Sequence, residues 1–133
     1  MKKIITLLAL VFYLNAYAQT ASEYFKSGYN KSANGDYKGS IQDFTKAIEL
    51  GYTPLDEVYC NRGVSKKLLG DYYGAIKDCS KAIELNPKDD MAYNSRGNAK
   101  DALKDYKGAI LDHTKSIEIN PKEAGYYYNR GGS

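Results

Sequence analysis

Residues 59–85, which read YCNRGVSKKLLGDYYGAIKDCSKAIEL, align without a gap with residues 93–119, which read YNSRGNAKDALKDYKGAILDHTKSIEI. Residues 24–50, which read YFKSGYNKSANGDYKGSIQDFTKAIEL, form a third copy. The copies are offset by 35 residues and then by 34, and a fourth copy begins at Tyr127. Self-similarity at such a period is typical of solenoids, in which small supersecondary units stack on one another.

Each copy contains two blocks with the residue spacing of an amphipathic helix. In the second copy, Ala75, Cys79 and Ala82 follow i, i+4, i+7 spacing and share one helix face. Gly70 and Asp71 separate this block from the one before it. Glycine can end a helix in the left-handed conformation, and aspartate can cap the start of the next. The predicted unit is therefore a helix, a tight turn and a second helix.

Prolines mark the end of each unit. Asn86-Pro87 and Asn120-Pro121 follow the second helical block of two copies. Because proline cannot continue a helix, we expect the second helices to end there.

Small residues recur where the two helices of a unit must touch. We expect Gly63 to face Ala75 and Gly97 to face Ala109. Glycine costs about 1 kcal/mol relative to alanine inside a helix, so it needs a packing reason at these positions.

The pattern resembles the tetratricopeptide repeat (TPR), whose signature is a bulky aromatic, a small glycine, an alanine, a second aromatic and a terminal proline. The matching residues in two copies are Tyr59, Gly63, Ala75 and Pro87, and Tyr93, Gly97, Ala109 and Pro121. The resemblance implies an all-α fold, an α-solenoid of stacked helix-turn-helix hairpins in a right-handed superhelix. It divides the chain into repeat 1 (21–55), repeat 2 (56–89), repeat 3 (90–123) and a truncated repeat 4 (124–133).

Charged and small residues replace apolar ones at several positions of that signature. Arg62 and Arg96 stand where the family usually has leucine. Lysines occupy the usual tyrosine position of three repeats, namely Lys31, Lys66 and Lys100. The second aromatic position keeps Phe44 in repeat 1 but holds Cys79 and His113 in the next two. The chain is similar to the arginine-glycine variety of the repeat, which is often found in bacterial arrays.

Aspartates recur at one place in the second helices, and arginines recur at one place in the first helices that follow. If each aspartate pairs with the arginine of the following repeat, every aspartate and every arginine of the set has a partner. Pairing within repeats would instead leave Asp43 facing Ser27. The planar guanidinium suits two-bonded contact with a carboxylate. The predicted inter-repeat ion pairs are Asp43–Arg62, Asp78–Arg96 and Asp112–Arg130. The alternative is solvated surface charge, because exposed ion pairs contribute little.

Residues 1–18 have the features of a secretory signal peptide. Two lysines begin the segment, residues 4–14 are almost entirely apolar, and Ala16 and Ala18 are the small residues that a signal peptidase inspects. Cleavage is expected before Gln19. The alternative is a membrane anchor, but the apolar run is shorter than the roughly 20 residues that span a bilayer.

Cleavage would leave residues 19–133 as a TPR array in the periplasm or outside the cell. An oxidising compartment permits a Cys60–Cys79 disulfide, and the alternative is two independent packing residues. The whole chain has 19 basic and 16 acidic residues, and removal of Lys2 and Lys3 leaves a net charge of +1. This balance gives no electrostatic case for a nucleic acid partner or for binding to an anionic membrane, and no stable membrane insertion is expected after cleavage.

The sequence contains no constellation that points to catalysis. His113 is the single histidine and stands at a packing position of the repeat. A catalytic or metal site needs several convergent partners. Neither a glycine-rich phosphate loop nor a nucleophile elbow is present in the sequence. We therefore expect no enzyme activity, no metal and no cofactor.

In the family, the first helices line a concave groove that usually receives an extended or helical peptide. The resemblance thus implies a non-catalytic scaffold that binds an unidentified protein or peptide. The residues expected to face the groove are Phe25, Tyr29, Cys60, Val64, Lys67, Asn94, Asn98 and Asp101. A known family clamp for acidic C-terminal tails needs lysine and asparagine where this chain has Phe25 and Tyr29, so that activity is not implied.

Two other functions remain open at this level. The C-terminal end of the array, around Ile110 and Ile117, can serve as a homo-oligomer contact, because a repeat array needs a polar cap at its last hairpin. The chain can also be the N-terminal fragment of a larger protein with a different activity.

Overall fold

The computed structural model describes residues 1–122 and builds them from α-helices and turns. The helices are α1 (Lys2–Ala33), α2 (Tyr37–Glu49), α3 (Leu55–Leu69), α4 (Tyr72–Leu85), α5 (Asp90–Ala102) and α6 (Tyr106–Ile119). No strand occurs in residues 1–122, which confirms the predicted all-α fold. The predicted truncated repeat, residues 124–133 with Arg130, lies outside the described residues.

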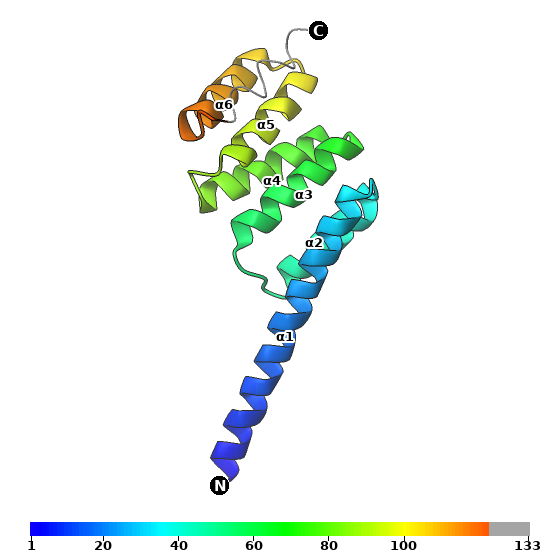
Figure 1. The fold of residues 1–133 in the computed structure, drawn as a ribbon, viewed down its shortest axis with the longest axis vertical. Coiled ribbons are helices and arrows are strands. Elements are labelled where there is room, and N and C mark those ends of the chain that lie inside the picture. The colour runs from blue at the N-terminus through cyan, green and yellow to red at the C-terminus, as the bar shows by residue number, and fades with distance from the viewer. Residues whose placement is uncertain (123–133) are drawn as a thin grey trace.

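The helices form hairpins that stack in chain order (Figure 1). Helix α1 packs on α2, α3 on α4 and α5 on α6, while α2 contacts α3 and α4 contacts α5 across the hairpin boundaries. Helix α3 also touches both α1 and α5, so the first helices of the hairpins line one side of the stack. This arrangement confirms the predicted solenoid of helical hairpins.

Fully buried apolar residues lie where one hairpin meets the next. Val58 of α3 packs against Phe44 and Ala47 of α2. Further along, Cys60 of α3 lies in a cluster with Ala82 of α4 and Ala92 of α5. A single hairpin cannot bury these residues alone, so the core depends on stacking.

The turn inside each hairpin follows the same design. The side chains of Asp36, Asp71 and Asp105 cap the second helices, accepting the N–H of the residue three positions later at 2.9, 2.9 and 3.0 Å. The residue before each aspartate has a positive φ: 83° at Gly35, 92° at Gly70 and 65° at Lys104. The predicted cap and left-handed turn at Gly70-Asp71 are thus confirmed.

The second helices end before their prolines, as predicted. Helix α4 ends at Leu85, before Asn86-Pro87, and α6 ends at Ile119, before Asn120-Pro121. The asparagine amides also tie each end to the start of the first helix of the same hairpin. They donate to carboxylates 30 residues earlier at 3.0 and 3.1 Å, in the pairs Asn86–Asp56 and Asn120–Asp90.

A glycine brings the two helices of each hairpin close together. A Cβ added at Gly63 would lie 2.8 Å from Sγ of Cys79, and one added at Gly97 would lie 2.8 Å from Cε1 of His113. In repeat 1, a Cβ at Gly28 would lie 2.9 Å from the Phe44 ring. The nearest side chain is therefore the residue at the second aromatic position. The carbonyl oxygen of Ala75 lies 3.3 Å from the same Cβ position at Gly63, so Gly63 does meet Ala75, through its backbone.

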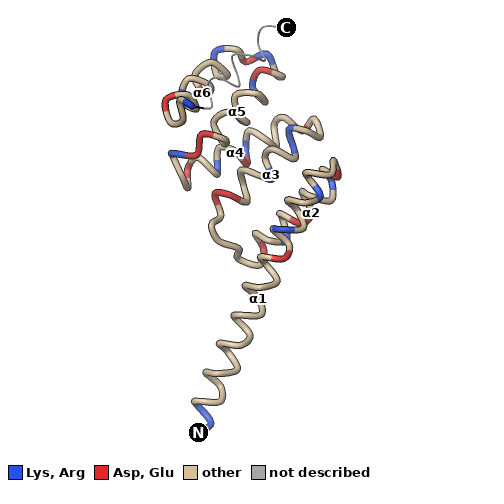
Figure 2. The backbone as a smooth tube through the Cα atoms, viewed as in Figure 1, with Lys and Arg blue, Asp and Glu red and all other residues tan. Residues whose placement is uncertain are grey.

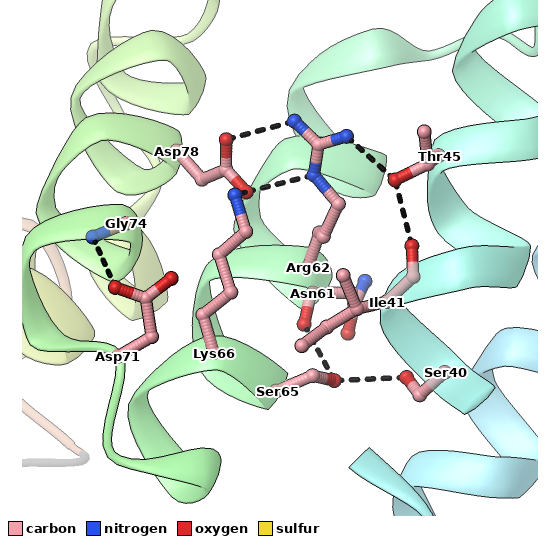
Figure 3. Close-up of polar contacts among 10 residues, drawn as sticks. All are labelled: Ser40, Ile41, Thr45, Asn61, Arg62, Ser65, Lys66, Asp71, Gly74 and Asp78. Carbon is pink, nitrogen blue, oxygen red and sulfur yellow. Dashed lines mark hydrogen bonds and ion pairs between the residues drawn. The ribbon is translucent and has the colours of Figure 1, made fainter. Parts of the chain in front are cut away.

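The arginines bind aspartates within their own hairpin, not across the boundary. Arg62 donates through Nε and Nη2 to both carboxylate oxygens of Asp78 at 2.8 and 2.9 Å (Figure 3). Arg96 binds Asp112 in the same way at 2.9 and 2.7 Å. The predicted inter-repeat pairs Asp43–Arg62 and Asp78–Arg96 are therefore wrong, and the Asp112 carboxylate of the third predicted pair is held by Arg96.

Repeat 1 has no arginine, yet its aspartate Asp43 finds both of its partners within its own hairpin. Ser27 stands at the arginine position and donates to Asp43 at 2.6 Å, while Lys31 lies 2.7 Å from the same oxygen. The equivalent lysines Lys66 and Lys100 bind the other two aspartates at 2.8 and 2.7 Å. Each lysine lies one helical turn after the serine or arginine, so each carboxylate already has a cation within its hairpin.

The third guanidinium nitrogen makes the contact across the hairpin boundary. Nη1 of Arg62 donates to Oγ1 of Thr45 at 2.9 Å (Figure 3). In the next hairpin, Nη1 of Arg96 donates to Oγ of Ser80 at 3.1 Å. Each arginine also lies over an aromatic ring of its own helix, 5.4 Å from the Tyr59 centroid and 5.5 Å from that of Tyr93. One arginine thus joins two helices of its hairpin to the preceding hairpin.

The N-terminal part of α1 projects from the stack (Figure 1). Residues 1–20 are exposed, and Ala21, which is 1% exposed, is the first buried residue of the chain. Lys2 and Lys3 are the charged residues of this projecting segment (Figure 2). Helix α1 is long and apolar enough to cross a membrane by length and composition, a test that signal sequences also pass.

The turn at Lys104 generates the first prediction. A residue with a side chain is strained by about 1 kcal/mol at positive φ, whereas glycine is not. Lys104→Gly is expected to raise the free energy of unfolding by about 1 kcal/mol. The reciprocal change Gly70→Lys is expected to lower it by a similar amount. Urea denaturation followed by circular dichroism measures both, and equal effects of the same sign would contradict the strain.

The buried carboxylate of Asp112 generates the second prediction. Burial alone would raise its pKa, but hydrogen bonds from Arg96 and Lys100 hold that pKa below the ordinary value. A depressed pKa means that the stabilisation is complete above about pH 4, the pKa of an unfolded aspartate, and is lost as pH falls through the folded-state pKa. Asp112→Asn should therefore cost about 3 kcal/mol at pH 7.

Urea denaturation of Asp112→Asn and wild type between pH 7 and pH 2 measures this difference. It should shrink as pH drops below about 4, because wild-type Asp112 then becomes protonated. Glu118→Gln, in the exposed pair with Lys115 at 3.1 Å, is the control and should change stability by less than about 1 kcal/mol. A pH-independent difference would show that the carboxylate charge is not what stabilises the hairpin.

Candidate functional site

The side of the stack formed by the first helices carries two adjoining hollows. The first has a volume of about 560 Å³ and is lined by α1 residues and one α3 residue, namely Phe25, Lys26, Tyr29, Asn30 and Glu57. The second, of about 360 Å³, is lined by Tyr29, Pro54, Asp56, Glu57, Cys60, Asn61, Asp89 and Met91. Tyr29 and Glu57 line both, so the hollows form one continuous surface between α1, α3 and the start of α5.

An aromatic wall borders the first hollow. The Phe25 ring stacks on Tyr52 with centroids 4.4 Å apart and lies 5.7 Å from the Phe44 ring. These contacts fix Phe25 against the core of repeat 1. Tyr29, one turn further along α1, is 58% exposed. The wall therefore consists of the Phe25 ring, which is held in place by its neighbours, and the exposed phenol of Tyr29. This combination of side chains suits contact with a ligand.

Acidic residues gather at the second hollow because helix starts favour them. Asp56 and Glu57 lie in the first turn of α3, and Asp89 is the N-cap residue of α5. Negative charge is stabilised near a helix N-terminus by the exposed backbone N–H groups. Asp89 accepts the N–H of Ala92 at 3.0 Å. The stacking of repeats brings these two helix starts to the same hollow.

The structure brings only some of the predicted groove residues to these hollows. Phe25, Tyr29 and Cys60 line them. Cys60 is 2% exposed and Asn94 is 9% exposed, so neither meets the expectation of a side chain open to a ligand. Cys60 packs with Ala82 and Ala92 in the interior of the stack. The remaining predicted residues are half-buried or exposed on α3 and α5, namely Val64, Lys67, Asn98 and Asp101.

Eight lining residues were absent from the predicted set, and four of them lie at the starts of α3 and α5. Asp56 and Glu57 precede the first aromatic of repeat 2, and Asp89 and Met91 lie at the corresponding start of repeat 3. The signal that would have pointed to this region is the acidic start of α3 and of α5, each of which follows a proline turn.

The two cysteines are free and buried, so their role in the described structure is packing. Burial is the main cause that raises the pKa of both thiols, and it brings the pKa of Cys79 to about 12. Such thiols stay protonated and are poor nucleophiles near neutral pH. His113 packs against Gly97. Within residues 1–122, no group of three or more His, Cys, Asp or Glu residues is placed to hold a metal ion.

Family models recognise two of the hairpins. Two models described as tetratricopeptide repeat match residues 56–89 and residues 92–123. The first range covers α4 and all of α3 but its first residue, and the second covers α6 and all of α5 but its first two residues. A comparison with curated protein sequences finds no match.

Solved structures with the same architecture are TPR domains. The TPR domain of Arabidopsis OM64 is 25% identical, with a TM-score of 0.76 over 80% of this chain and 87% of that one. The first TPR of Spaghetti (RPAP3), bound to the HSP90 peptide SRMEEVD, is 27% identical, with a TM-score of 0.73 over 79% of this chain and 82% of that one. The Sgt2 TPR domain from Aspergillus fumigatus is 25% identical, with a TM-score of 0.71 over 77% and 67% of the two chains. With its repeated glycine contacts and stacked hairpins, this chain is a tetratricopeptide-repeat protein.

Proposed function

We propose that this protein is a non-catalytic scaffold that binds a peptide or protein segment on the side lined by its first helices. The observation that carries the proposal is the pair of adjoining hollows between α1, α3 and α5, which share the exposed Tyr29. Binding pockets are concave, have volumes of about 300–1,000 Å³ and combine apolar walls with a few polar groups. Both hollows fit that description.

A structural relative supports peptide binding as the mode. The first TPR of Spaghetti (RPAP3) is bound to the HSP90 peptide SRMEEVD and shares its fold with 79% of this chain. The same peptide is not carried over as the ligand, because Phe25 and Tyr29 stand where an acidic-tail clamp needs lysine and asparagine. We therefore propose that this chain shares the peptide-binding mode, while the residues of its own groove determine which peptide it binds.

The site of action is proposed to be the periplasm or the exterior of the cell. Residues 1–18 combine Lys2 and Lys3 with an apolar run, and residues 1–20 are exposed in the structure. Burial begins at Ala21, so removal of residues 1–18 takes away no buried residue of the array. An exposed apolar leader with a charged start matches the properties of a cleaved signal peptide.

A second candidate function is self-assembly through the outer face of α6. Ile110 and Ile117 are 64% and 42% exposed. Their equivalents in repeat 2, Ile76 and Ile83, are only half-exposed because the next hairpin packs on α4. Concentration-dependent size in sedimentation would favour this function, and Ile110→Lys should then produce a monomer.

The third prediction tests the groove. The full chain, expressed with its leader so that the host processes it, is used to select binders from a random heptapeptide library. Tyr29→Ala is expected to weaken the selected peptides at least tenfold, because truncation of an aromatic anchor typically costs about 2 kcal/mol. Tyr73→Ala is the matched control, since Tyr73 is 76% exposed on α4, and it should leave affinity unchanged. Equal loss in both variants, measured by fluorescence polarisation, would remove the groove as the binding site.

The fourth prediction tests the leader. Intact-mass measurement of the chain exported by a Gram-negative host should give a protein that begins at Gln19. Ala18→Arg should block cleavage, because the peptidase requires a small residue there. Tyr17→Arg is the matched control, since the intervening position is not inspected. Recovery of full-length wild-type chain in the membrane fraction would instead identify the segment as an anchor.

A further inference from the structure

The carboxylates at the second hollow form no ion pair within residues 1–122. Within residues 1–122, the ion pairs use six carboxylates, namely Asp43, Asp78, Asp112, Glu49, Glu84 and Glu118. None of these pairs includes Asp56, Glu57 or Asp89. Three acidic groups with no paired cation therefore meet at the hollow between α3 and α5.

Local structural roles account for only part of this charge. Asp56 accepts the amide of Asn86 at 3.0 Å, and Asp89 accepts a backbone N–H at 3.0 Å. Both partners are neutral groups, so neither removes the negative charge. Glu57 is exposed and lines both hollows. Its negative charge therefore borders the same two hollows as Tyr29.

The charged residues lining the two hollows do not balance. Lys26, at the first hollow, is the one cationic residue among the lining residues, against Asp56, Glu57 and Asp89. The lining therefore has a formal charge of −2. A concave surface with one sign of charge concentrates oppositely charged ligands and repels those of like sign.

Apolar contacts lie directly beside the acidic groups. Tyr29 is 58% exposed and Met91 is 50% exposed, and both line the second hollow. The face of Tyr29 can hold a cation, and its edge can pack against an aliphatic chain. Lysine and arginine present this combination, with a charged head on an apolar stem.

We propose that the groove selects peptide segments in which a lysine or arginine side chain lies next to an apolar residue, and that it discriminates against acidic segments. The proposal rests on the proposed peptide-binding function and names its ligand class. The cationic head lies in the second hollow among Asp56, Glu57 and Asp89. The apolar neighbour lies in the first hollow against Phe25 and Tyr29. The hollows share a wall, so adjacent or near-adjacent residues of an extended ligand reach both.

Two labelled heptapeptides that differ at three positions test this inference. One is SRMEEVD, and the other is SRMKKVK, in which lysines replace the three acidic residues. Both keep the Arg-Met pair, so the difference between their affinities reports the discrimination against acidic segments. The full chain, processed by its host, is titrated with each peptide by fluorescence polarisation at low and physiological salt. We expect SRMKKVK to bind at least tenfold more tightly than SRMEEVD, with a preference that weakens as salt screens the charges.

Variants assign the preference to the groove. Glu57→Lys should reduce the ratio of the two affinities at least tenfold, and Glu57→Gln should reduce it by an intermediate factor. Glu118→Lys is the matched control, because Glu118 is an exposed glutamate of α6, and it should leave the ratio unchanged. A circular dichroism melt of each variant confirms that the hairpins remain folded.

The outcomes separate this inference from the proposed function. Equal binding of the two heptapeptides, or tighter binding of SRMEEVD, overturns the charge preference even if Tyr29→Ala abolishes binding. Absence of binding by both heptapeptides, together with library peptides that depend on Tyr29 but show no surplus of lysine and arginine, overturns it as well. A library that yields no Tyr29-dependent peptide overturns both the preference and the scaffold function.

Discussion

The closeness of the two helices in each hairpin is the constraint on which the rest of the structure depends. Gly28, Gly63 and Gly97 leave no side chain at the contact, so Phe44, Cys79 and His113 press directly against the first-helix backbone. Three different side chains occupy the equivalent position in the three hairpins, because the glycine, and not the side chain that packs on it, sets the distance between the two helices. That distance then allows the arginines of α3 and α5 to reach the carboxylates of α4 and α6 with two bonds each.

The features predictable from the sequence are those that repeat with the period. The helical blocks, the cap at Asp71, the left-handed Gly70 and the ends before Pro87 and Pro121 depend on neighbours in the chain. A local pattern is enough to predict such features. The stacking of hairpins also follows, because each copy has apolar residues that it cannot bury by itself.

Features that depend on contacts between helices were harder to predict. The sequence prediction paired each arginine with the aspartate of the preceding hairpin, whereas the structure pairs it with the aspartate of its own hairpin. Matching the number of opposite charges takes no account of which helix surfaces are in contact. Ser27 bound to Asp43 is the informative exception, since it shows that the serine occupies the arginine's place within the hairpin. The acidic hollow was missed for a related reason: Glu57 and Asp89 lie 32 residues apart, and only stacking brings their helix starts together.

The hydrogen bonds across the hairpin boundaries bear on how the number of repeats can change in evolution. They join Arg62 to Thr45 and Arg96 to Ser80. Each uses a hydroxyl of one unit and a guanidinium of the next, both supplied within a single period of sequence. In-frame duplication of repeat 2 or of repeat 3 would therefore recreate this contact without any compensating substitution. The length of such an array can change between related genomes while its joints stay the same, and selection is left free to act on the few groove residues that differ from unit to unit.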